Sequence, residues 1–384
     1  TNQVVVVHNG IVENYLDLHH DLEAAGVQFK SDTDTEIIVH LIEMFLARGM
    51  AIVEGTRKAL LMLKGAHGVV VFSTLEPDKV ICARIGNAGG VVVGIGDGEM
   101  YIASDIPAIL EYTRRMVFLE SQQMGIVTKD GLEVRSLSGE RVHFEEHTIS
   151  WDPVAAEKGE YRHFMQKEIH EQVRSLTDTL AGRVDFEAGK IHLPQLNLTP
   201  TLAARIQKIV ITACGTAAHA GQVGKILIER IARIPVEVDI ASEFRYRDPL
   251  VDENTVILAI SQSGETADTL SAMDEGRKRG AILWSIVNAI GSQAMRISDG
   301  FISMQTGPEI GVASTKAFTA PLLDLYMLAI LLGDLRGTLP EEERIRLVAD
   351  LRLVPDLVGK CLDREANIIQ AAREMKYIRN MLYL

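Results

Sequence analysis

Two hydrophobic patterns alternate along the second half of the chain. Short apolar runs, such as residues 256–260, end at small hydroxyl residues and glycine, here Ser261-Gln262-Ser263-Gly264-Glu265-Thr266. The next residues place Ala267, Leu270 and Met273 on one face of a helix. Residues 208–213 lead in the same way into a turn at 214–216 and a helix through residue 230. Strands that alternate with helices predict a parallel sheet with helical crossovers, which is a doubly wound α/β domain.

The first half has a different pattern. A β-branched run at residues 4–7 meets His8-Asn9-Gly10, and Leu18 and Leu22 then share a helical face. Thr33 and Glu36 have the spacing of a capping box at the start of a second helix. Further predicted elements are a helix at about 53–63 and strands at 68–73, 80–84, 91–95 and 100–103. Helices followed by several antiparallel strands predict a layered α+β domain.

The regular pattern is interrupted between the two halves. Residues 145–161 contain pattern-breaking turn residues, residues 163–180 are predicted to form a helix, and residues 182–200 are irregular. The most apolar segment, 317–332, contains Pro321 and Asp324, which favours a buried core helix over a membrane span. The predicted divisions are the α+β domain at 1–144, a linker and connecting helix at 145–200, the α/β domain at 201–350, and a helix with the opening strand of a truncated further domain at 351–384.

Charge and cysteine usage narrow the classes of function. The net charge of −13 argues against nucleic-acid and membrane-surface partners, which bind basic patches. Cys82, Cys214 and Cys361 lie far apart without a CxxC pair, so a reducing, cytoplasmic location is expected. The histidines lack the spacing of metal ligands near acids, so we predict no metal site and no cofactor.

The turn at Ser261–Thr266 is the strongest candidate for ligand binding. A strand end, a Ser/Gly turn and a helix start together provide unpaired N–H groups, hydroxyls and a favourable dipole for an anion. The alternative is a turn with an N-cap, because Ser and Thr are favoured there for local reasons. The similar turn at 214–216 follows a neighbouring strand, and two such turns predict one phosphorylated ligand. Ser314 and Thr315 either only cap the next helix or also contact this ligand.

Two groups in the first half could take part in chemistry. Asn9 and Gly10 could offer a side-chain amide and a backbone N–H to a developing oxyanion, or could form an ordinary Asn-Gly turn. Asp34 could bind a ligand's α-amino group, or could only favour the dipole of the helix that follows. Cys214 is expected to be a small turn residue rather than a nucleophile.

Several motifs in the chain resemble one family. Ser261-Gln262-Ser263-Gly264-Glu265-Thr266-Ala267-Asp268-Thr269 and Glu309-Ile310-Gly311-Val312-Ala313-Ser314-Thr315-Lys316 resemble the first sugar-isomerase (SIS) domain of the isomerising glutamine–fructose-6-phosphate aminotransferases, also called glucosamine-6-phosphate synthases. His8-Asn9-Gly10-Ile11-Val12-Glu13-Asn14 and Thr33-Asp34-Thr35-Glu36 resemble the class II glutaminase domain of the same family. The resemblance extends to Cys214-Gly215-Thr216, Ala241-Ser242-Glu243-Phe244-Arg245-Tyr246-Arg247 and Tyr161-Arg162-His163-Phe164-Met165-Gln166-Lys167-Glu168-Ile169.

The resemblance implies an N-terminal-nucleophile glutaminase domain with α/β/β/α layers, followed by a sugar-isomerase domain. It implies that glutamine supplies ammonia, which converts fructose 6-phosphate to glucosamine 6-phosphate. Asn9 and Gly10 would then form the oxyanion hole, and Asp34 would bind the α-amino group of glutamine. A homodimer through the SIS half is also expected. The residues expected around the sugar phosphate are Cys214, Gly215, Thr216, Ser261, Gln262, Ser263, Thr266, Val312 and Ser314.

The sequence also departs from the family pattern. Ala217 stands where a serine is usual, so one phosphate contact of the family is expected to be weakened or lost in this chain. The family's nucleophilic cysteine and second sugar-isomerase domain are not found in these residues, and the chain alone is therefore expected to be inactive. The alternative function is a non-catalytic phosphosugar-binding or regulatory SIS module, which would lack a glutaminase half.

Overall fold

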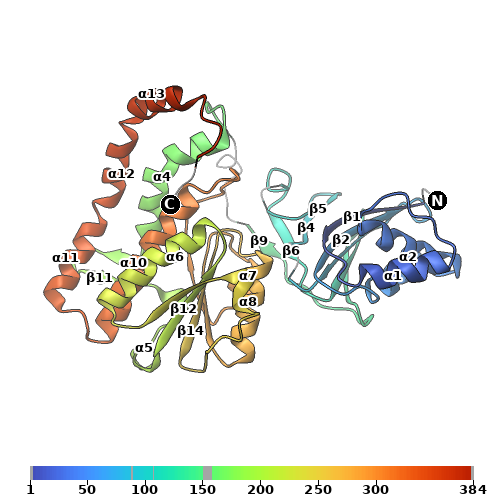
Figure 1. The fold of residues 1–384 in the computed structure, drawn as a ribbon, viewed down its shortest axis with the longest axis horizontal. Coiled ribbons are helices and arrows are strands. Elements are labelled where there is room, and N and C mark those ends of the chain that lie inside the picture. Colours follow the sequence, from blue (N-terminus) through green and yellow to red (C-terminus); the bar gives the residue numbers. More distant parts are fainter. Residues whose placement is uncertain (1–2, 88–89, 107, 150–157, 382–384) are drawn as a thin grey trace.

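The computed structural model describes residues 3–87, 90–106, 108–149 and 158–381. Figure 1 shows two halves side by side, one built on antiparallel sheets and the other on a parallel sheet. The edge of the N-terminal half that carries β4, β6 and β9 faces the part of the C-terminal half that carries α7 and α8 (Figure 1).

The N-terminal half contains two antiparallel sheets. Their strand orders are β1-β2-β3-β7-β8 and β5-β4-β6-β9. The helices are α1 (Tyr15–Ala24), α2 (Thr35–Ala47) and α3 (Ile52–Leu60), and the strands are β1 (Val4–Gly10), β2 (His67–Ser73), β3 (Val80–Ile85), β4 (Val92–Ile95), β5 (Met100–Ala103), β6 (Arg115–Phe118), β7 (Gln123–Thr128), β8 (Gly131–Ser136) and β9 (His147–Thr148).

Strand β2 shows why these elements form layers. Successive side chains of a strand point to opposite faces, so Val69 and Val71 pack against the helices while Val70 packs toward the second sheet. The helix side contains Ile37, Ile38 and other buried residues of α2. One helical layer and two sheet layers result, which confirms an α+β half.

The start of α2 differs from the prediction. The capping box at Thr33 and Glu36 is wrong, because the helix begins at Thr35 with Asp34 at its N-cap and without a side-chain cap. The Glu36 carboxylate instead accepts hydrogen bonds from the backbone N–H groups of Lys30 and Ser31, at 2.8 Å each. These bonds and the Ser31 hydroxyl lower the pKa of Glu36 to about 2, against the opposing effect of burial. Glu36 therefore fixes the loop before α2 rather than the first helical turn.

The C-terminal half contains a five-stranded sheet in the order β13-β12-β14-β15-β16, and every pair in it is parallel. Its strands are β12 (Lys208–Ala213), β13 (Val236–Ile240), β14 (Thr255–Ser261), β15 (Ile282–Val287) and β16 (Gly300–Ser303). The helices of this half are α5 (Pro200–Arg205), α6 (Thr216–Ile231), α7 (Ala241–Phe244), α8 (Ala267–Lys278), α9 (Gln293–Ile297), α10 (Lys316–Leu335) and α11 (Glu341–Leu351).

Helices cover both faces of this sheet. One face packs against α6, α10 and α11, and the other packs against α7, α8 and α9. Strand β14 lies in the centre and is buried along its whole length, as expected for a parallel strand covered on both sides. The order of the first strands reverses between β12 and β14, where ligands bind in open sheets of this kind. The parallel α/β prediction is confirmed.

Helix α10 is the core helix of the C-terminal half. Its length and apolar composition would allow a membrane span, but most of its residues are buried inside this half. The fully buried Asp324 pairs with Arg183 at 3.1 Å across the core. The pairing of this acidic residue with an arginine inside the fold, together with burial of the surrounding residues, supports the core-helix prediction.

The connecting region is more regular than predicted. Helix α4 (Phe164–Leu180) agrees with the prediction, but residues 182–200 form the short strands β10 (Val184–Asp185) and β11 (Lys190–Ile191) and the 3₁₀ helix η2 (Pro194–Leu196). The predicted linker includes residues 150–157, which lie outside the described residues.

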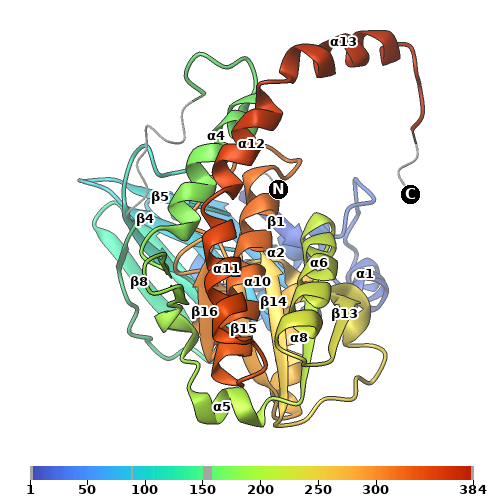
Figure 2. The ribbon, with the colours of Figure 1, turned by 90° about the vertical axis from the view of Figure 1, so that its left-hand side faces the viewer.

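The chain ends in two helices that extend away from the sheet. Helices α12 (Val354–Leu362) and α13 (Glu365–Met375) have no buried residue; α12 lies beside α4, and α13 projects beyond it (Figures 1 and 2). The predicted final strand falls mainly on residues 382–384, which lie outside the described residues.

Candidate functional site

The turn after β14 is held by its own hydroxyl groups. Ser261 Oγ accepts a hydrogen bond from the backbone N–H of Gly264 at 3.0 Å and lies 3.0 Å from Thr266 Oγ1. Ser263 Oγ accepts from the N–H of Glu265 at 3.2 Å. Ser261 is buried, whereas Gln262 and Ser263 are only partly buried. Ser261 thus shapes the turn, and its neighbours are the groups open to a ligand.

Gly264 allows this turn to approach the next loop. Its φ of +64° lies in the left-handed region, and a Cβ at this position would lie 2.1 Å from Ser292 Oγ. The turn after β14 and the loop after β15 therefore pack together without space for a side chain at residue 264.

The helix that follows this turn has an open N-terminus. Thr266 occupies the N-cap of α8 without a side-chain cap, and the first intrahelical bond runs from Leu270 N to Thr266 O. Gly215, at the N-cap of α6 after β12, likewise provides no side-chain cap. Both helix starts border the point between β12 and β14 where the strand order reverses. N–H groups without an intrahelical acceptor and the helix dipole make such places suitable for an anion.

The start of α10 is different. Glu309 Oε1 accepts hydrogen bonds from Thr315 N, Thr315 Oγ1 and Ala317 N at 2.8, 3.0 and 3.1 Å. Ser314 Oγ donates to the other Glu309 oxygen at 3.4 Å. Thr315 occupies the N-cap position as predicted, but neither its hydroxyl nor that of Ser314 caps the helix, because Glu309 is the capping side chain.

The predicted sugar-phosphate residues divide into separate groups. Cys214, Gly215 and Thr216 follow β12, while Gln262, Ser263 and Thr266 line a cavity of about 290 Å³. Val312 is fully exposed, and Ser314 is engaged with Glu309. Burial and the nearby Asp268 raise the pKa of the Cys214 thiol, which agrees with the expected structural role of this cysteine.

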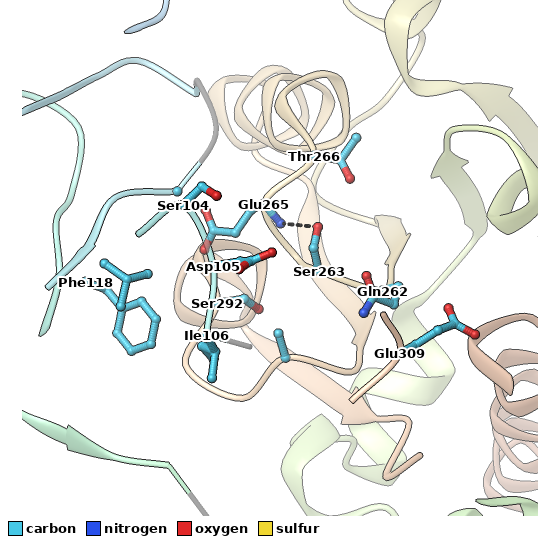
Figure 3. A pocket seen from close by; sticks show the side chains of 13 residues that line it. Ser104, Asp105, Ile106, Phe118, Gln262, Ser263, Glu265, Thr266, Ser292 and Glu309 are labelled. Carbon is cyan, nitrogen blue, oxygen red and sulfur yellow. Dashed lines mark hydrogen bonds between the residues drawn. The ribbon is translucent and has the colours of Figure 1, made fainter. Parts of the chain in front are cut away.

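The cavity lies between the two halves of the molecule (Figure 3). One wall comes from the turn after β14, the loop after β15 and Glu309. The opposite wall comes from the N-terminal half. The residues that line it are Gly90, Val92, Ser104, Asp105, Ile106 and Phe118 on the N-terminal side and Gln262, Ser263, Glu265, Thr266, Ala289, Ser292 and Glu309 on the C-terminal side.

An ion pair joins the two walls. Arg84 from β3 has a side chain only 1% exposed, and its Nη2 lies 3.0 Å from Glu265 Oε2. The other oxygen of Glu265 accepts from the backbone N–H of Gln293 at 2.8 Å. Sequence patterns do not reveal this contact, because the two partners lie 181 residues apart and neither belongs to a local charge pattern.

The candidate glutaminase residues lie close together at the end of β1. Asn9 and Gly10 pair with Gly68 and His67 of β2, so they end a strand rather than forming an Asn-Gly turn. The Asp34 carboxylate accepts a hydrogen bond from Val12 N at 2.8 Å. This bond brings the start of α2 beside the end of β1.

A chain of hydrogen bonds that no sequence pattern indicates supports this region. His8 Nδ1 lies 3.0 Å from Thr35 Oγ1, and His8 Nε2 lies 3.0 Å from His67 Nδ1. His67 Nε2 lies 3.1 Å from the carbonyl of Lys64, which can only accept. Burial is the main cause that lowers the pKa of both histidines, and His67 lowers that of His8 further. When both rings are neutral, His8 can donate a hydrogen bond to His67, and His67 can donate one to the carbonyl of Lys64.

Comparisons with known proteins define the class of the two halves. Residues 1–111 match the glutamine amidotransferase domain family, and residues 203–331 match the SIS domain family. A glutamine–fructose-6-phosphate aminotransferase (isomerising) of Symbiobacterium thermophilum is 45% identical over 98% of this chain and 61% of its own length. An enzyme of the same name from Thermus thermophilus is 43% identical over 100% of the chain and 62% of its own length.

A solved structure agrees with these relatives. The C-terminal domain of glucosamine–fructose-6-phosphate aminotransferase from Francisella tularensis is 35% identical, with a TM-score of 0.54 over 57% of this chain and 61% of that chain. The fold and the matched families define a protein that joins an amidotransferase half to a SIS half. Its curated relatives, which are 41–45% identical over nearly the whole chain, are named isomerising glutamine–fructose-6-phosphate aminotransferases. The chain spans about three fifths of the length of the curated relatives it matches.

Proposed function

We propose that this chain is part of an enzyme that uses glutamine to aminate and isomerise fructose 6-phosphate to glucosamine 6-phosphate. The chain contributes the binding sites for both substrates. The phosphate monoester is held by the hydroxyl-lined turn at 261–266, and glutamine is held at the end of β1.

One observation carries the sugar-phosphate part of the proposal. Two helices without side-chain caps, α6 and α8, begin next to each other at the reversal of strand order. Hydroxyls at Thr216, Ser263 and Thr266 add donors to the helix N–H groups. A small dianion is the ligand that this combination favours.

The glutamine part rests on the end of β1. Asn9 and Gly10 are exposed there, and Asp34 is tied to the same region through Val12. An amide and an N–H group suit an oxyanion, and the carboxylate suits the ligand's ammonium group. We infer from the helix, sheet and sheet layers that this half is a class II glutaminase of the N-terminal-nucleophile type.

The chain alone should bind glutamine without hydrolysing it. Cys82 is the cysteine of this half, and complete burial raises the pKa of its thiol to about 12. A buried, protonated thiol in the sheet core cannot serve as the nucleophile. Hydrolysis of glutamine therefore requires a nucleophile other than Cys82.

A regulatory phosphosugar-binding module accounts for less of the chain. It explains the SIS half but gives no role to residues 1–111, which match an amidotransferase family. We further propose a cytoplasmic enzyme that dimerises through its SIS half and has neither nucleic acid nor membrane as a partner. The three free thiols agree with a reducing compartment.

Calorimetry tests the sugar-phosphate site directly. We expect the chain to bind fructose 6-phosphate and glucosamine 6-phosphate, and Ser263→Ala to weaken both. Loss of one hydroxyl contact to a charged group costs about 1.5–3 kcal/mol, or roughly 10- to 150-fold in affinity. Ser271→Ala in α8, the helix that follows this turn, is the control and should bind like the unmodified chain. Absence of binding heat with both sugars would refute the proposal.

A further inference from the structure

The end of β1 is tied to the start of α2 on both sides of Gly10. Before Gly10 in the chain, His8 Nδ1 lies 3.0 Å from the hydroxyl of Thr35, the first residue of α2. After Gly10, the backbone N–H of Val12 donates to Asp34 Oδ2 at 2.8 Å. The candidate oxyanion donor therefore lies between two contacts to the segment that carries the candidate ammonium-binding carboxylate.

His8 and His67 lie on one face of the β1–β2 pair. Gly10 lies opposite His67 in this antiparallel ladder. His8 lies opposite Val69, so the two histidines are diagonal neighbours on the same face. Val69 packs against the helices, which places the histidine pair on the face toward α2.

The backbone of Gly10 packs directly on the two rings. A Cβ at Gly10 would lie 3.1 Å from both His8 Nε2 and His67 Nδ1. The nearest atom to this Cβ, at 2.2 Å, would be the carbonyl oxygen of Ala66, which directly precedes His67. Since the rings fill the space on this side of Gly10, they set the separation between the end of β1 and the start of α2.

The pair is buried but fully hydrogen-bonded. His67 is 0% exposed, and His8 is partly buried. Every ring nitrogen has a partner, namely Thr35, Lys64 or the other ring. Since the Lys64 carbonyl can only accept, the neutral pair needs an acceptor at His67 Nδ1 for the N–H of His8. A satisfied polar pair of this kind specifies one arrangement of the surrounding backbone, whereas apolar side chains of similar size tolerate several.

We propose that His8 and His67 are positioning residues for glutamine, and that their hydrogen-bonded pair holds the backbone of Gly10 at a fixed distance from Asp34. This inference rests on the glutamine part of the proposed function and adds two residues that act through Gly10 and Asp34 rather than on the ligand. The α-amino group and the side-chain amide lie at opposite ends of glutamine, so this distance decides whether both ends are held at once.

Two matched substitutions test the link to α2. Thr35→Val removes the hydroxyl that contacts His8 and keeps the shape of the side chain. In calorimetry on the full chain it should weaken glutamine binding by about 2- to 12-fold, which corresponds to the loss of one hydrogen bond. Thr56→Val makes the same change in α3, where the buried hydroxyl has no hydrogen-bond partner within the described structure. This control should bind glutamine like the unmodified chain.

Two substitutions of His67 separate positioning from a general loss of structure. His67→Asn keeps an acceptor oxygen near the place of Nδ1 and should retain most of the glutamine affinity. His67→Leu leaves the N–H of His8 without an acceptor and should weaken glutamine binding at least as much as Thr35→Val does. Thermal unfolding should show all four variants folded at the temperature of the calorimetry.

Nitrogen-15 NMR of the histidine rings tests the pair without a ligand. Near neutral pH, His8 and His67 should each carry their hydrogen on Nε2. A hydrogen on Nδ1 of neutral His67, equal glutamine affinities in the two threonine variants, or equal weakening by the two His67 variants would overturn the inference. Absence of glutamine binding by the unmodified chain would refute the glutamine part of the proposed function, and this inference with it.

Discussion

Alanine at position 264 should disturb the phosphate turn through a clash as well as through strain. The left-handed conformation costs a non-glycine residue about 1–2 kcal/mol. The added methyl group would also lie 2.1 Å from Ser292 Oγ and 2.5 Å from Ser292 Cβ, so one of the two loops must move. Overpacking of this kind costs about 1–3 kcal/mol. Gly264→Ala should therefore destabilise the chain by about 2–5 kcal/mol.

Gly280→Ala separates the two contributions. Gly280 has a φ of +84° with no atom within 4 Å of the position of a Cβ, so only the strain of about 1–2 kcal/mol remains. Urea unfolding followed by the fluorescence of Trp284, which is fully buried in this half, measures both variants. Ser292→Gly combined with Gly264→Ala should restore about 1–3 kcal/mol by removing the clash. Equal costs for the two alanine variants would refute the close packing of the loops.

Two further predictions concern buried titrating groups. Burial raises the pKa of Asp324 to about 7, although Arg183 opposes the rise, so between about pH 4 and pH 7 the folded chain keeps a proton that the unfolded chain has lost. Relative to the Asp324→Asn variant, the free energy of unfolding of the unmodified chain should therefore fall by up to about 1.4 kcal/mol per pH unit as the pH rises through this window. If urea unfolding gave the same pH dependence of this free energy for both proteins, that would contradict the prediction. A thiol reagent should label the exposed Cys361 in the native chain and the buried Cys82 only after unfolding, as mass spectrometry can show; rapid native labelling of Cys82 would be the opposite result.

Local patterns were sufficient to predict the elements of the C-terminal half. Residues 256–260 are uniformly apolar because β14 is covered on both faces, and the glycine in the turn marks a true left-handed residue. The capping predictions failed at Thr33 and at Ser314. In both places a glutamate satisfies backbone N–H groups that the prediction did not assign to it: Glu36 accepts from the loop before α2, and Glu309 accepts from the first residues of α10. Sequence spacing alone does not reveal such a choice.

The joint between the halves could not be predicted from sequence. Arg84 is a single polar residue in an otherwise ordinary segment, and its importance depends on which surface of the other half faces it. The histidine pair was similarly hidden, because His8 and His67 are 59 residues apart and meet only through strand pairing. The roles of Asn9, Gly10, Asp34 and the sugar-phosphate residues stay predictions, and the calorimetry with sugar phosphates tests the last of these.

The pairing of Arg84 with Glu265 has a consequence for chimeras made from related proteins. Glu265 belongs to the phosphate turn, yet one of its oxygens is held by an arginine of the other half. A hybrid that takes its first half from a relative without this arginine would leave a carboxylate without its cation beside the sugar-phosphate site. The two halves are therefore not interchangeable modules, and residues 84 and 265 should be transferred, or altered, together.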